Sequence, residues 1–354
     1  MPLLPEPVEI KMKLFKHLVY IFLMETLKID LKNLDLLAYL PSRLVELYCG
    51  YIQLTQLPEL PHTLRVLNCP HNRLRQLPKL PALTVLDVTS NCLSHLHLPK
   101  TLTKLYCSFN DGIELSTLPI GLKELYCCNN HITELCLPPR VEVVYCSYNQ
   151  LSSLTLPDGL KDLCCDHNKI KRLVLPDTLV ALDCIDNQIR SLVLPPSLRE
   201  LSANYNRLTS VTLNKGLTRV GLSGNPIREV PALHKGIVFL NLNHTQIERC
   251  FEFHPPLGEN GGLYFSGTPL YTKMKAVLHT ETYIFDPVMI HMAFDMIRMI
   301  EGKFNENYYG LKIKERMMAW LWRARESLAK RKYHPDELWK MLDQDDYVNA
   351  LEEW

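Results

Sequence analysis

The sequence predicts an α/β solenoid in which short parallel strands line the concave face, extended segments form the convex face, and helices cap both ends. Two observations carry this prediction. A unit of about nineteen residues recurs through the middle of the chain, and after the last unit this period ends and helix-forming residues prevail. A short fixed period indicates stacked coils that share one continuous core, even in a chain of 354 residues.

One copy of the unit, residues 156–173, reads LPDGLKDLCCDHNKIKRL, and the next, residues 175–192, reads LPDTLVALDCIDNQIRSL. The shared skeleton is L-P-x-x-L-x-x-L-x-C-x-x-N-x-(I/L)-x-x-L. Cys164, Asp166 and His167 fall between the shared positions, where the residues change from copy to copy. Their proximity in sequence therefore reflects variable positions of a repeat and does not define a motif.

The asparagine of the skeleton marks the successive copies. It recurs at Asn72, Asn91, Asn110, Asn130, Asn149, Asn168, Asn187, Asn206 and Asn225. Ile52 holds this position before them, and Thr245 and Thr268 hold it after them. The array is predicted to span residues 24–270, as about twelve repeats preceded by one degenerate unit.

This skeleton resembles a leucine-rich repeat, and its recurrent Leu-Pro is similar to the LPX class found in bacterial effector proteins. A looser resemblance links the chain to repeat proteins of large DNA viruses. The segment L-x-x-L-x-C is expected to form a strand that buries Leu163 and Cys165 and turns Cys164 outward, because side chains alternate along a strand. The resemblance also implies that each asparagine turns inward, where its amide bonds backbone groups of neighbouring coils.

The inward cysteine position holds seven of the twelve cysteines: Cys49, Cys69, Cys107, Cys127, Cys146, Cys165 and Cys184. Val88, Ala203 and Leu222 occupy the same position elsewhere, which indicates that it requires a small or medium apolar group. Reduced, buried thiols predict an intracellular location, cytoplasmic or nuclear, with the inside of a host cell as one such setting. Residues 14–24 are too short and too polar to predict a membrane span.

Residues 1–23 are predicted to form an N-terminal helical cap and residues 271–354 a helical C-terminal module. The module includes a basic segment at 312–332, but acidic residues follow it, so a solvated helix face is favoured over a nucleic-acid site. The net charge of +1 also gives no overall attraction to nucleic acid.

The outward strand positions are predicted to form an acidic, tyrosine-rich concave face that binds a protein partner with a basic patch. The residues assigned to this face are Tyr48, Tyr51, Tyr106, Phe109, Glu124, Tyr126, Tyr145, Tyr148, Asp162, Asp183, Asp186 and Tyr205. Tyrosine suits such a face because it offers a large contact area at a small entropic cost. No metal site or cofactor is assigned, although Cys164, Asp166 and His167 could meet carboxylates and Cys128 of neighbouring coils.

Effectors with similar LPX repeats often carry a C-terminal ubiquitin ligase domain with a Cys-x-Asp nucleophile. Here Cys250 is the last cysteine, so no ligase residue is assigned and a non-catalytic scaffold is predicted. A substrate-receptor role beside a separate ligase is one alternative, and nucleic-acid binding through the basic C-terminal helix is the other. The sequence leaves the oligomeric state open.

Overall fold

The computed structural model describes residues 24–32, 34–115, 117–252 and 262–277, together with residues 290, 293, 294 and 297. The predicted N-terminal cap and the predicted basic C-terminal helix lie outside these residues. The chain divides into two compact units, Met1–Arg207 and Leu208–Trp354.

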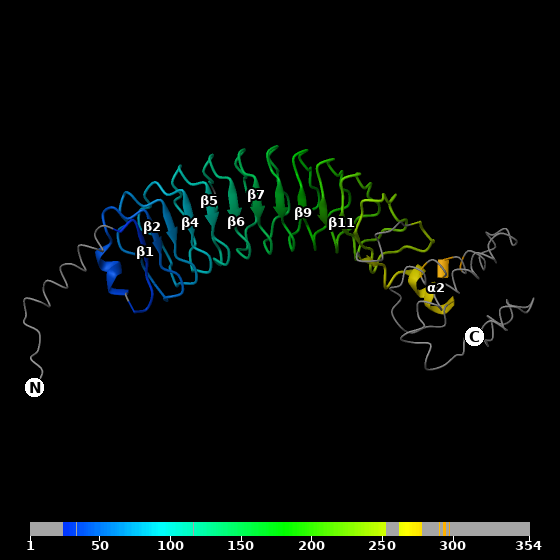
Figure 1. The fold of residues 1–354 in the computed structure, drawn as a ribbon, viewed down its shortest axis with the longest axis horizontal. Helices are drawn as coiled ribbons and strands as arrows, with labels where there is room; N and C mark the ends of the chain where they lie inside the picture. The colour runs from blue at the N-terminus through cyan, green and yellow to red at the C-terminus, as the bar shows by residue number, and fades with distance from the viewer. Residues whose placement is uncertain are drawn as a thin grey trace, which may run out of the picture. The chain divides into compact units, whose positions relative to one another are not determined.

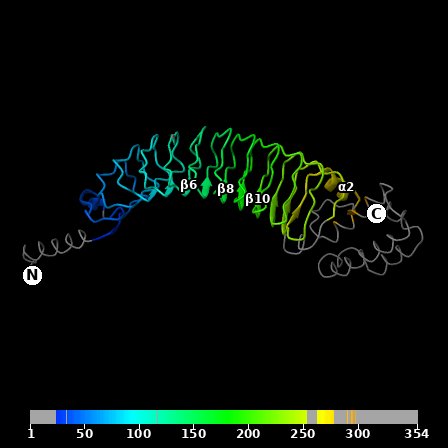
Figure 2. The same cartoon turned by 90° about the horizontal axis from the view of Figure 1, so that it is seen from above.

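The first unit is a stack of coils that each contribute one short strand to a parallel sheet (Figure 1). Neighbours in the sheet are also neighbours along the chain, as expected for a solenoid. Its elements are β1 (Thr26–Lys28), the 3-10 helix η1 (Leu34–Tyr39), β2 (Glu46–Tyr48), β3 (Val66–Asn68), β4 (Val85–Asp87), β5 (Lys104–Tyr106), β6 (Glu124–Tyr126), β7 (Val143–Tyr145), β8 (Asp162–Cys164), β9 (Ala181–Asp183) and β10 (Glu200–Ser202). Strands β6, β8 and β10 lie along the inner side of the curve that these coils make (Figure 2).

The second unit contains β11 (Arg219–Gly221), β12 (Phe239–Asn241), β13 (Leu263–Tyr264) and the helix α2 (Pro269–Val277). Its strands pair in parallel and in chain order. Thr268, which holds the asparagine position of the last coil, also caps α2, because its Oγ1 accepts a hydrogen bond from the backbone N–H of Tyr271 (3.0 Å). Pro269 suits the first helical position, where no N–H is needed.

The predicted parallel-strand solenoid is confirmed, and side-chain alternation explains it. In β8 the central Leu163 is fully buried, whereas Asp162 and Cys164 on either side of it are half-buried and face outward. Cys165 follows and is again fully buried. Because Cys164 pairs in register with Asp183 of β9, equivalent positions of successive coils form straight columns across the sheet.

The inward cysteines form one of these columns inside the first unit. All seven are buried, and burial raises the pKa of Cys127, Cys146 and Cys165 well above the usual range of a thiol. All twelve cysteines of the chain are free. A protonated, buried thiol behaves as a small apolar group, so this column contributes packing and not reactivity.

The asparagine side chains link each coil to the previous one. Asn168 donates from Nδ2 to the carbonyls of Cys165 in its own coil (3.1 Å) and Cys146 in the coil before (3.0 Å), and its Oδ1 accepts from the N–H of Leu151 (3.0 Å). Asn149 and Asn187 repeat this pattern, and Asn130 makes the same two Nδ2 bonds while its Oδ1 accepts from the N–H of Asn110 (2.6 Å). These amides satisfy backbone groups that the stacking of coils would otherwise bury without partners.

The Leu-Pro step closes each coil without a helix. The carbonyl of Pro157 accepts a hydrogen bond from the N–H of Leu160 (3.1 Å), and Pro176 makes the same bond with Leu179 (3.1 Å). Among the described residues of the first unit, η1 is the only helical element. The return segments are therefore short and extended, which brings the chain back to the sheet within about nineteen residues.

Candidate protein-interaction face

Two columns of outward side chains in the first unit form the face that the sequence assigns to partner binding. The strand column is the last residue of each strand from β2 to β10: Tyr48, Asn68, Asp87, Tyr106, Tyr126, Tyr145, Cys164, Asp183 and Ser202. The turn column lies three residues further along each coil: Tyr51, His71, Ser90, Phe109, Asn129, Tyr148, His167, Asp186 and Tyr205.

Three tyrosines of the strand column stack into a continuous ladder. The ring centroids of Tyr106 and Tyr126 are 4.6 Å apart with the planes nearly parallel (11°), and those of Tyr126 and Tyr145 are 4.9 Å apart and tilted. All three rings remain half-buried and present one surface to solvent. Strand register produces this ladder, because β5, β6 and β7 each place a tyrosine at the same paired position.

Carboxylates hold two of the three hydroxyl groups of this ladder. Tyr106 donates from Oη to Glu124 (3.3 Å), and Tyr145 donates to Asp162 (3.1 Å). Burial and the nearby Asp162 raise the pKa of Tyr145 to about 12. The phenols therefore stay protonated near neutral pH, with their oxygens anchored at the edge of the ladder.

The turn column has an unusual backbone. Every one of its nine residues has a positive φ, between 51° for Asp186 and 62° for Tyr51. This left-handed region costs little for asparagine or glycine but strains a bulky aromatic residue. Even so, Tyr51, Phe109, Tyr148 and Tyr205 occupy it with 70%, 55%, 52% and 56% of their surface exposed.

Two aromatic residues of the turn column stack on histidines of the following coil. Tyr51 lies 4.4 Å from His71 and Tyr148 lies 4.1 Å from His167, measured between ring centroids. Large exposed rings on a strained backbone lower the stability of the fold. A surface function is the usual reason that a protein keeps such residues. This column therefore adds a second apolar row beside the tyrosine ladder.

We expect Phe109→Asn to raise the free energy of unfolding by about 1 kcal/mol, because asparagine tolerates the left-handed backbone. The chain provides the precedent, since Asn129 adopts the same φ of 57° in the next coil. Equilibrium denaturation with urea measures the change. A loss of stability would mean that the exposed ring of Phe109 packs more strongly than its exposure indicates.

Charge is distributed unevenly over this face. Lys104 pairs with Glu124 (2.8 Å) beside the tyrosine ladder, and Lys161 pairs with Glu142 (2.6 Å) at its rim. No Lys or Arg pairs with Asp166 or Asp183 among the residues that the structure describes. The net acidity predicted for the face is thus concentrated around β8 and β9.

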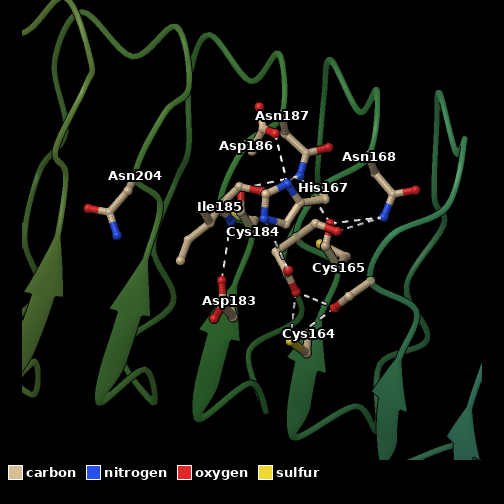
Figure 3. Close-up of polar contacts among 12 residues, drawn as sticks. Cys164, Cys165, His167, Asn168, Asp183, Cys184, Ile185, Asp186, Asn187 and Asn204 are labelled. Atoms are coloured by element: carbon tan, nitrogen blue, oxygen red, sulfur yellow. Dashed lines mark hydrogen bonds and ion pairs between the residues drawn. The ribbon is translucent and has the colours of Figure 1, made fainter. Parts of the chain in front are cut away.

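The cluster around β8 and β9 gathers polar residues of the copies at 156–173 and 175–192 (Figure 3). Cys164 Sγ donates to Asp166 Oδ1 (3.1 Å) and lies 3.3 Å from Ser147 Oγ, which also donates to Asp166. His167 Nδ1 lies 2.8 Å from Asp186 Oδ2. Burial raises the pKa of Cys164 to about 12, and the surrounding acids reinforce this, so its thiol is not an activated nucleophile.

The structure brings most, but not all, of the assigned residues together. Coils β5 to β8 hold the largest group: Tyr106, Phe109, Glu124, Tyr126, Tyr145, Tyr148 and Asp162. Asp183, Asp186 and Tyr205 continue the face on coils β9 and β10. Tyr48 and Tyr51 stand apart, because coils β3 and β4 lie between them and the ladder.

Two side chains that the sequence reasoning did not assign also contribute. Ser147 bridges Cys164 and Asp166, and His71 stacks on Tyr51. Comparing equivalent positions of successive copies would have identified both residues. Ser147 is equivalent to Asp166, and His71 is equivalent to Tyr51.

The coils, their parallel register and the asparagine hydrogen bonds define the architecture. The chain is a leucine-rich repeat solenoid. YopM from Yersinia enterocolitica WA-314 has a similar structure, with a TM-score of 0.50 and 29% identity over 65% of this chain and 61% of that chain. The functional domain of InlJ from Listeria monocytogenes, which includes a cysteine ladder, gives a TM-score of 0.59 and 25% identity over 69% of this chain and 58% of that one.

YopM from Yersinia pestis, a leucine-rich effector protein, gives a TM-score of 0.52 and 26% identity over 66% of this chain and 80% of that chain. The solenoid spans about three fifths of the length of the first YopM structure and of the InlJ domain. No protein-family model and no curated sequence matches the chain. The similarities support a leucine-rich repeat scaffold for protein interaction in general, similar to the arrays of bacterial effectors.

Among the described residues, no helix combines the length and the apolar character needed to cross a membrane.

Proposed function

We propose that the protein is a non-catalytic scaffold that binds a protein partner on the outward face of coils β5 to β9. The tyrosine ladder of Tyr106, Tyr126 and Tyr145 carries this proposal. Stacked rings, two of which have hydroxyls held by carboxylates, form a rigid, half-exposed surface that loses little entropy on binding. Such tyrosines are the side chains that most often dominate a protein interface.

Charge favours a partner segment that contains Arg or Lys. Asp166 and Asp183 lie beside the ladder without a Lys or Arg partner among the described residues, and the exposed Asp186 next to them contacts His167. A guanidinium group could stack on the tyrosine rings and pair with these carboxylates. The same negative charge disfavours a phosphate backbone, so we propose a protein partner and not a nucleic acid.

The cysteines support a scaffold over an enzyme with a thiol nucleophile. The raised pKa values of Cys164 and of the buried column describe thiols that remain protonated, whereas a catalytic thiol needs a lowered pKa. Free thiols throughout the chain also fit the intracellular location predicted from the sequence.

The test is affinity purification from a cell lysate with the native protein and a variant in which Tyr106, Tyr126 and Tyr145 are replaced by Ala. A partner that depends on the ladder should lose at least about 3 kcal/mol of binding energy, or more than about a hundredfold in affinity. Binding of the identified partner should also weaken as salt rises.

The control variant removes apolar surface elsewhere, at Val174 and Val193 of the return segments, which are 86% and 88% exposed. Circular dichroism establishes that both variants fold. Partners that are lost only with the tyrosine variant support the proposal, whereas the same partner list for all three proteins contradicts it.

A further inference from the structure

We propose that Cys164, Asp166 and Asp183 form a binding site for a divalent zinc-type cation on the outward face. One ligand atom of each residue, the Cys164 Sγ and one carboxylate oxygen each from Asp166 and Asp183, lies within 4.8 Å of the other two. Cys164 ends β8, Asp183 ends β9, and Asp166 follows two residues after Cys164. The site needs no partner protein, and its Asp166 and Asp183 are the carboxylates that the proposed function offers to a basic partner, so the two ligands would compete.

The fold supplies this convergence. Cys164 and Asp183 are paired neighbours in the strand column, so the sheet fixes the distance between their backbones. Asp166 returns toward Cys164 because the chain turns directly after the strand, and its Oδ1 lies 3.1 Å from the thiol. All three side chains are half-buried, which limits the number of rotamers that they can adopt.

The absence of a lysine distinguishes this cluster from Glu124 and Glu142, and the proximity of two carboxylates distinguishes it from Asp87. Glu124 and Glu142 each pair with lysine, and Asp87 accepts a hydrogen bond from Asn68 Nδ2 (3.0 Å). Asp166 and Asp183 have no Lys or Arg partner in the part of the chain that the structure describes. His167 is the nearest basic group, with its Nε2 3.9 Å from Asp166 Oδ2.

Asp166 and Asp183 also place two negative charges next to each other on the outward face. Two half-buried carboxylates next to each other without a lysine or arginine are unfavourable, and a bound divalent cation would remove that cost.

The ligand types select the metal. Zn²⁺ accepts thiolate, imidazole and carboxylate ligands, whereas Mg²⁺ and Ca²⁺ take oxygen ligands alone. One sulfur and two carboxylates therefore favour Zn²⁺. Three protein ligands leave one position of a tetrahedral ion open for solvent. Binding converts the Cys164 thiol to a thiolate and releases its proton to solvent.

The site can be tested on the full chain after treatment with a chelator. Zn²⁺ titration by calorimetry gives stoichiometry and affinity, and Co²⁺ as a substitute ion reports a thiolate ligand by its sulfur-to-metal charge-transfer absorption. The background protein carries Cys92→Ser and Cys136→Ser, which remove the two exposed thiols. We expect one ion per chain and a charge-transfer band.

The chain itself suggests substitutions that the fold accepts. Cys164→Ser introduces the residue that β10 carries in the same column, Ser202, and Asp183→Asn introduces the residue that β3 carries there, Asn68. Each should weaken Zn²⁺ binding about tenfold or more, and Cys164→Ser should also abolish the charge-transfer band. Asp87→Asn, in the same column on β4, is the matched control and should change neither.

The proposal stands only if both substitutions weaken binding and the control does not. Absence of Zn²⁺ binding by the background protein overturns it. Binding that survives Cys164→Ser or Asp183→Asn unchanged also overturns it, because the ion would then occupy other residues. Thermal unfolding without metal shows whether each variant is folded before it is titrated.

Discussion

Asn168→Ala is expected to lower the free energy of unfolding by about 3–5 kcal/mol. The side chain is buried and makes hydrogen bonds to two coils, from Nδ2 to the carbonyls of Cys146 and Cys165 and from the Leu151 N–H to Oδ1. Alanine removes all of these contacts at once and leaves the buried Leu151 N–H without its partner, whereas the carbonyls of Cys146 and Cys165 keep the bonds that Asn149 and Asn187 donate. An unsatisfied buried group costs about 1–3 kcal/mol and each lost hydrogen bond about 0.5–1.5 kcal/mol more, although relaxation and water entry recover part of the sum.

Urea denaturation followed by circular dichroism measures this loss. Lys171→Ala, an exposed substitution in the same coil, is the control and should change stability by less than about 0.5 kcal/mol. Asn168→Asp keeps the acceptor oxygen but removes the amide donor, so it should also be strongly destabilising. A loss below about 1 kcal/mol for Asn168→Ala would show that water replaces the amide and that the asparagine bonds do not hold the coils together.

Cys165→Asn is expected to cost about 3 kcal/mol or more, whereas Cys164→Asn should cost less than about 1 kcal/mol. The two residues are adjacent, but Cys165 is fully buried in the apolar column and Cys164 faces outward. An asparagine at 165 would bury an amide without hydrogen-bond partners. At 164 the same residue is acceptable, because Asn68 already occupies that column in β3.

Both variants should be compared with the native protein by urea denaturation in the presence of a chelator, so that metal binding does not contribute. Equal effects of the two substitutions would contradict the alternation of side chains along β8. A shift in the slope of the transition, and not only in its midpoint, would mean that one part of the solenoid unfolds before the rest.

The architecture was predictable because it depends on local, repeated constraints. A skeleton leucine or cysteine at every second strand position specifies which side chains turn inward, and Leu-Pro steps leave no room for a helix in the return segment. The same arithmetic assigned Tyr106, Tyr126 and Tyr145 to one face, since they occupy equivalent positions of successive copies. The use of these residues by a partner remains a proposal.

The details of the face were less accessible from the sequence. The positive φ of Phe109 and Tyr148 could not be read from residue types, because aromatic residues do not favour that region. The pairing of Lys104 with Glu124 was also missed, and it shifts the acidic centre of the face from the tyrosine ladder toward β8 and β9. Side-chain pairing depends on rotamers and distances that a repeat pattern does not specify.

The sequence by itself determined the repeat length, the parallel solenoid, the inward cysteine and asparagine columns, and the set of side chains that share the outward face. These features follow from the periodicity of the sequence, because every copy of the unit repeats the same pattern of apolar and polar positions. Only the tertiary structure decided which of those side chains touch: the stacking of the tyrosines, the strained turn column, and the convergence of Cys164, Asp166 and Asp183. Side-chain contacts between coils depend on the register of the paired strands and on the side-chain rotamers, and both are decided only when the coils stack.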